Sequence, residues 1–73
     1  MRMRTPDELA IRGAIYNRNF YRARAKQRRD TALIIDQAGG HSVAFDLRKL
    51  AADDERTASS CDAYARECGY TGE

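Results

Sequence analysis

Six cationic side chains are concentrated between Tyr16 and Arg29, a stretch that contains no acidic residue. Guanidinium groups pair with phosphate or carboxylate oxygens, and contacts of this kind to nucleic acid also release counterions. Aromatic rings interleaved with the cations could stack on unpaired bases. We therefore expect this stretch to bind an anionic partner, with a site made of Arg18, Arg22, Arg24, Lys26, Arg28, Arg29 and Tyr21.

The charge of the whole chain leaves three interpretations of this stretch open. Residues 1–30 hold nine basic and three acidic groups, whereas residues 31–73 hold four basic and eight acidic groups, so that the total is +2. The acidic part would repel phosphate, which favours a protein surface with patches of both signs over nucleic acid. The third interpretation is a solvated helix whose aromatic rings face the core and whose arginines face water or the chain's own acids.

The element that carries the cations is expected to be a helix. Thr5 is a suitable N-cap, followed by Pro6 at the first helical position and by two carboxylates, and the helix would end near Asp30. One face is expected to face the core, and it holds Leu9, Tyr16, Phe20 and Ala23. Ile11 and Ile15 form a second apolar stripe.

Residues 31–45 are expected to form a short β-hairpin. Thr31–Ile35 is apolar and rich in β-branched residues, Ser42–Phe45 alternates small and large residues, and Gly39-Gly40 lies between them as a turn. The alternative is that the first helix continues to Ala38, with Gly39 as its C-terminal cap.

The last part of the chain is expected to be helical again. Asp46 could cap a short helix, and Asp53–Glu55 could open a second one that ends at Gly69. The fold class predicted from these elements is α+β, a single domain over residues 1–73 with flexible ends at 1–5 and 70–73. Leu, Ile, Val and Phe supply only eleven residues, so the core is thin and a partner could supply missing burial.

Several classes of function are not expected. Cys61 and Cys68 are too far apart along a helix for a disulfide, and with His41 they lack the close ligand pairs of a zinc site. Neither a phosphate-binding glycine loop nor a catalytic triad is present in the sequence. We therefore expect a cytoplasmic, non-enzymatic protein without cofactors, membrane attachment or a small-molecule substrate.

The basic stretch, with its interleaved aromatic rings, is similar in composition to the arginine-rich RNA-binding helices of phage antitermination proteins. Together with the acidic Asp53–Glu55 group, it resembles small phage-encoded host-takeover regulators, which include an RNA-polymerase-binding transcription regulator from a Xanthomonas phage. The resemblance implies binding to bacterial RNA polymerase, with inhibition of initiation or antitermination. The alternatives are direct RNA or DNA binding and inhibition of another host complex, such as a CRISPR nuclease.

Overall fold

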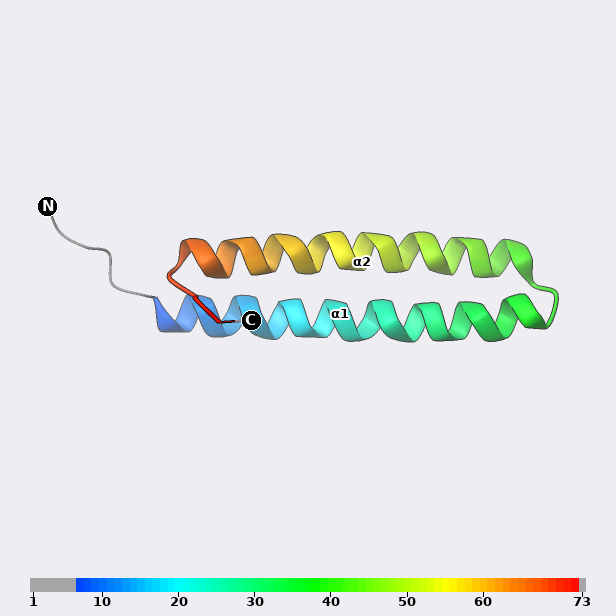
Figure 1. The fold of residues 1–73 in the computed structure, drawn as a ribbon, viewed down its shortest axis with the longest axis horizontal. Coiled ribbons are helices and arrows are strands. Elements are labelled where there is room, and N and C mark those ends of the chain that lie inside the picture. Colours follow the sequence, from blue (N-terminus) through cyan, green and yellow to red (C-terminus); the bar gives the residue numbers. More distant parts are fainter. Residues whose placement is uncertain (1–6, 73) are drawn as a thin grey trace, which may run out of the picture.

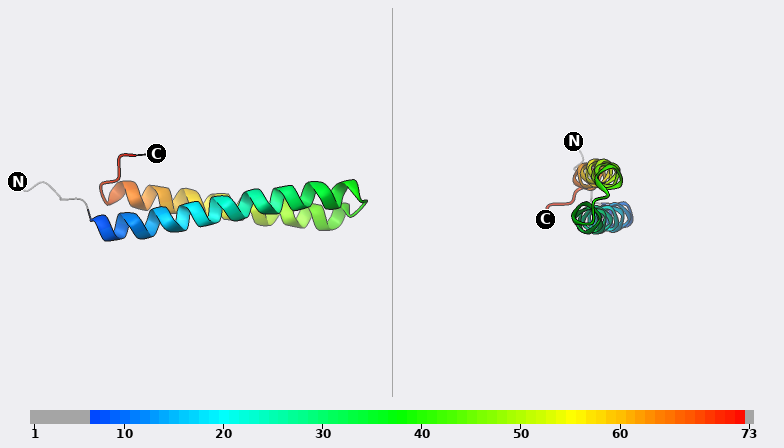
Figure 2. Two further views of the ribbon diagram at one scale, coloured as in Figure 1. Left: turned by 90° about the horizontal axis from the view of Figure 1, so that it is seen from below. Right: turned by 90° about the vertical axis from the view of Figure 1, so that its right-hand side faces the viewer.

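Two long antiparallel helices make up the fold (Figure 1). The computed structural model describes residues 7–72, in which α1 covers Glu8–Gln37 and α2 covers His41–Glu67. At a rise of 1.5 Å per residue the helices are about 45 and about 40 Å long. They lie side by side along their whole length and cross at a shallow angle (Figure 2). The predicted α+β fold is wrong, because residues 7–72 contain no strand.

The segment predicted as a β-hairpin, residues 31–45, is instead the end of α1, a tight turn and the start of α2. Gly39 has a φ of +95°, a conformation that glycine adopts without strain, and the amide of Gly40 donates to the carbonyl of Ile35 at 2.8 Å. A Cβ on Gly40 would lie 2.6 Å from Cγ2 of Ile35, so the turn requires glycine here too. The alternative in which α1 continues and Gly39 follows its end is confirmed.

The open ends of the hairpin are tied together by Asp7. Its side chain caps α1 by accepting from the amide of Ala10 at 3.1 Å, and its own amide donates to the carbonyl of Cys68 at 3.1 Å. Thr5, predicted as the N-cap, and Pro6, predicted as the first helical residue, lie outside the described residues. At the other end of the chain, α2 stops just before Gly69, which has a φ of +111° and confirms the predicted helix stop.

A seam whose most buried apolar residues are alanines joins the helices. It follows alternating spacings of three and four residues, which is the pattern of two helices that wrap around each other. On α1 the seam consists of Ile11, Ala14, Arg18, Tyr21, Ala25, Arg28, Ala32 and Ile35. On α2 it consists of Ala44, Leu47, Ala51, Asp54, Ala58, Cys61 and Ala65, and it ends at Cys68, the residue just after the helix. All these residues are buried or half-buried, and both cysteines are free thiols. The two separate helices predicted from Asp46 and Asp53 are therefore one continuous helix.

The distribution of apolar residues is inverted relative to an ordinary core. The buried hydrophobic residues of the described chain are all alanines, and no large side chain is fully buried. Nine large apolar residues are exposed instead, namely Leu9, Tyr16, Phe20, Leu33, Ile34, Val43, Phe45, Leu50 and Tyr64. The expected core face of Leu9, Tyr16, Phe20 and Ala23 thus points away from α2, whereas Ile11 lies on the seam.

Candidate functional site

The six cations of the predicted site do not form one open surface. Five of them are paired with carboxylates of the chain, at 2.7 Å for Arg18–Asp62, 2.8 Å for Arg24–Asp54, 2.9 Å for Lys26–Asp30, 3.0 Å for Arg28–Asp54 and 2.6 Å for Arg29–Glu55. All but Lys26–Asp30 join α1 to α2. Arg22 is exposed and forms no ion pair with any described residue. The interpretation in which the arginines face the chain's own acids is therefore the one that the structure supports.

Asp54 is the most enclosed of these carboxylates. Its side chain is 5% exposed and accepts three hydrogen bonds, two from Arg24 at 2.8 and 3.1 Å and one from Arg28 at 3.0 Å. The hydrogen bonds from Arg24 lower the pKa of Asp54, and this effect outweighs the burial that raises it. Asp54 thus holds two of the predicted partner-binding arginines against α2.

Arg18 and Tyr21 are also directed inward. The guanidinium of Arg18 is buried, bonds to Asp62 and lies 5.7 Å from the ring centroid of Tyr70. The ring of Tyr21 is half-buried on the seam, and the guanidinium of Arg24 lies 5.1 Å from its centroid. A ring held in this way is not free to stack on a base, so the predicted role of Tyr21 finds no support in its position.

Ion pairs concentrate on one side of the hairpin, which we call the charged side. There Arg29 and Asp36 of α1 face Glu55 and Arg48 of α2. The hydrogen bond from Arg29 lowers the pKa of Glu55, and hydrogen bonds from His41 and then Arg48 lower the pKa of Asp36. Most of the basic groups of α1 that were predicted to bind a partner therefore pair with acidic groups of α2.

Because the carboxylates that bridge the helices have lowered pKa values, acid is expected to destabilise the hairpin. Asp36, Asp54, Glu55 and Asp62 all favour the ionised form when folded. Their contribution is complete above the ordinary values of 3.8 for Asp and 4.5 for Glu, and is lost as the pH falls below them. Thermal unfolding followed by circular dichroism from neutral pH to about pH 2 measures the loss. A midpoint that stays constant or rises below about pH 4 would contradict it.

The opposite side of the hairpin carries few charges, and we call it the apolar side. Next to the seam, the strip of α1 at residues 10, 13, 17, 20, 24, 27, 31 and 34 holds one charged residue, Arg24, which is paired. The matching strip of α2 at residues 43, 46, 50, 53, 57, 60, 64 and 67 holds three, the exposed carboxylates of Asp46, Asp53 and Glu67. The large residues of the apolar side, with their exposed fractions, are Phe20 (49%), Ile34 (67%), Val43 (53%), Leu50 (44%) and Tyr64 (54%).

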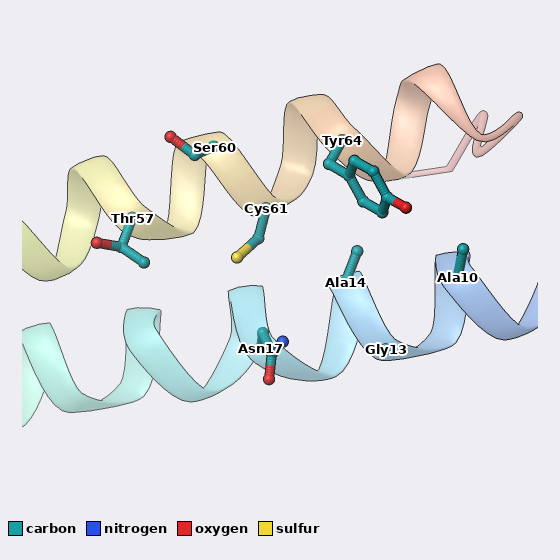
Figure 3. Close-up of a pocket in the computed structure, with 8 residues that line it drawn as sticks. All are labelled: Ala10, Gly13, Ala14, Asn17, Thr57, Ser60, Cys61 and Tyr64. Carbon is teal, nitrogen blue, oxygen red and sulfur yellow. The ribbon is translucent and has the colours of Figure 1, made fainter.

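A groove of about 410 Å³ opens on the apolar side between the helices, in the half away from the turn. Its lining residues are Ala10, Gly13, Ala14, Asn17, Thr57, Ser60, Cys61 and Tyr64 (Figure 3). A Cβ added to Gly13 would meet no atom within 4 Å, so the groove is open above this residue. The lining offers hydroxyls, an amide and a thiol, without a carboxylate or an imidazole, so it suits apolar and neutral groups.

The sequence contained a signal for this arrangement. Ala44, Ala51, Ala58 and Ala65 recur every seven residues, as do Ala25 and Ala32. A seven-residue repeat of small residues on two stretches of similar length is typical of helices packed closely together. The alanine repeat identifies the seam, and the large apolar residues beside it then fall outside the pair of helices.

Among the described residues, no three His, Cys, Asp or Glu side chains gather in a way that could hold a metal ion. Neither α1 nor α2 contains a stretch apolar and long enough to cross a bilayer. Comparisons with protein-family models, with curated proteins and with solved structures found no match to this chain.

Proposed function

We propose that this chain is a non-enzymatic binding protein that docks on helices of a protein partner through its apolar side. The observation that supports this is the inverted core, in which alanines are buried while five large side chains on one side are 44–67% exposed. Contiguous exposed apolar patches on small proteins are typical of interaction sites. A groove between two helices that lie side by side is also a common binding site for a third helix.

The chemistry of the groove supports a binding role over a catalytic one. General acid–base catalysis needs a titratable group within hydrogen-bond reach of the substrate, and the lining residues provide no carboxylate or imidazole. The Cys61 thiol is half-buried on the seam, beside small residues and without a neighbouring histidine among the lining residues. Activation of the thiol as a nucleophile would require such a neighbour or a comparable positive charge.

The narrower proposal is that the partner is bacterial RNA polymerase and that the chain regulates transcription. It rests on the resemblance of the sequence to phage host-takeover regulators. The ion pairs shift the expected contact from the six cations to the apolar side. Direct RNA or DNA binding remains the alternative, but five of the six cations already bind carboxylates of the chain. An electrophoretic mobility shift assay at low salt that detects no complex with RNA or DNA would exclude direct nucleic-acid binding.

Purified RNA polymerase is expected to bind the wild-type chain, and Ile34→Glu is expected to weaken that binding about tenfold or more, because it buries an unpaired charge in the contact. Fluorescence anisotropy of the labelled chain at moderate salt measures the affinity. Leu33→Glu is the matched control. Leu33 is adjacent and 54% exposed, and it lies four residues from Arg29 and three from Asp36, on the charged side.

These measurements test the identity of the partner and the location of the contact surface separately. If the wild-type chain does not bind polymerase, the proposal that polymerase is the partner fails. If polymerase binds and Leu33→Glu weakens the complex as much as Ile34→Glu does, the apolar side is not the contact surface.

A further inference from the structure

The intramolecular seam leaves most of the large apolar side chains without a place to be buried. Each seam alanine buries a single methyl group, whereas residues such as Ile34 and Leu50 remain substantially in water. Chains of this size usually need additional burial, a disulfide, a metal or oligomerisation to be stable. Cys61 and Cys68 form no disulfide, and the described residues contain no metal-binding cluster. Burial against another chain, either a partner or a second copy, is the remaining route by which these side chains leave water.

We propose that a second copy of this chain covers the apolar side in the free protein, so that two hairpins form a four-helix bundle. The inference rests on the proposed function, since it names an occupant of the same surface. A second copy presents two amphipathic helices of matching length, and these are the kind of partner that such a surface fits. Because both occupants use one surface, self-association and partner binding compete.

The exposed area agrees with what a stable dimer requires. The five large residues of the apolar side are continued around α1 by Tyr16 and Leu9, which are 72% and 81% exposed. The seven side chains together expose on the order of 800 Å², if a large side chain offers about 150–250 Å² in full. A standard protein–protein interface buries about 800 Å² on each partner. Isolated apolar patches on monomers are usually smaller than this.

The apolar side is self-complementary in shape. Three of its five bulky residues, Ile34, Val43 and Leu50, lie in the half near the turn, whereas the groove and Tyr64 at its wall lie in the half near the chain ends (Figure 3). A two-fold axis perpendicular to the helices places the bulky half of one copy over the groove of the other. The same contact then occurs twice, as in symmetric dimers generally.

The charges allow this packing as well. The α1 strip that would be covered contains only one charged residue, Arg24, and its guanidinium already binds Asp54 through two hydrogen bonds. The α2 strip contains three exposed carboxylates, Asp46, Asp53 and Glu67, and Asp53 is paired with Arg56. Docking through the charged side would instead cover Arg29, Glu55 and other ion-paired groups, which costs more desolvation. The apolar side is therefore the one that a second copy covers.

Light scattering coupled to gel filtration tests the proposal. The wild-type chain is expected to have twice the mass of one 8.3 kDa chain, with dissociation on dilution. Gly13→Leu should raise the dissociation constant about tenfold or more, because it fills the groove from within. The added Cβ meets no atom of the hairpin, and Leu favours helix more than Gly, so the single hairpin itself is not weakened.

Two further variants show whether a loss of the dimer is due to the contact surface or to unfolding of the hairpin. Ile34→Glu is expected to yield one-chain mass, and Leu33→Glu is expected to remain a dimer, while both keep the helical circular-dichroism signal. The inference is overturned if the wild type has the mass of one chain at every concentration. It is also overturned if the wild type is a dimer but Leu33→Glu dissociates it and Ile34→Glu does not. If the wild type is a monomer and Ile34→Glu still abolishes its binding to polymerase, the proposed function stands without the dimer. If the wild type is a monomer and Ile34→Glu binds polymerase as the wild type does, both the dimer and the proposed contact surface are overturned.

Discussion

Replacing Ala51 by Leu is expected to lower the free energy of unfolding by about 1–3 kcal/mol, the usual cost of an overpacked core. Ala51 lies at the middle of the α2 seam and is 0% exposed. Because the buried hydrophobic residues of the described chain are all alanines, the two helices lie close and leave no room for an isobutyl group. Chemical denaturation followed by circular dichroism, at one fixed protein concentration, measures the change.

Ala63→Leu is the control for this substitution. Ala63 lies on the same helix, is exposed and is absent from the seam, so the same added group meets water. A change within about 0.5 kcal/mol is expected there, as for most surface substitutions. If Ala51→Leu is neutral or stabilising, the seam is not closely packed, and the exposed apolar residues do not result from alanine packing.

The turn at Gly39-Gly40 was predictable from the sequence, but the type of the flanking elements was not predicted correctly. Thr31–Ile35 has the β-branched composition of a strand, yet the helix-propensity cost of such residues is only a few tenths of a kcal/mol each. Ala32 and Ile35 continue the spacing of the α1 seam, and Ala44 continues that of α2. Packing between the helices therefore outweighs the local preference for strand.

The charge split was visible in the sequence, but its purpose depended on the fold. With two helices joined at residues 38–40, residue 18 lies beside residue 62 and residue 24 beside residue 54. Basic α1 and acidic α2 then neutralise each other across the seam. Under an α+β fold these pairs were not foreseeable, and the same charges were interpreted as a docking surface with two signs. An error in secondary structure thus became an error in the predicted site.

Asp54→Asn is expected to destabilise the hairpin by about 1–2 kcal/mol, since an amide offers one acceptor oxygen to two guanidinium groups. Removing one member of a buried ion pair costs about 3–5 kcal/mol when the other cannot reach water. Here the side chains of Arg24 and Arg28 are 39% and 26% exposed, so both can turn to solvent and the cost is smaller. Chemical denaturation of the two proteins at neutral pH gives the difference.

Asp53→Asn separates the effect of these hydrogen bonds from that of net charge. Asp53 precedes Asp54 in α2 and pairs with Arg56, and the two side chains are 60% and 73% exposed. Both substitutions remove one negative charge from the same turn of α2, and the exposed pair is worth less than about 0.5 kcal/mol. Equal losses in the two variants would show that the general attraction between basic α1 and acidic α2 holds the hairpin together. A larger loss for Asp54→Asn assigns that role to the carboxylate enclosed between the two arginines.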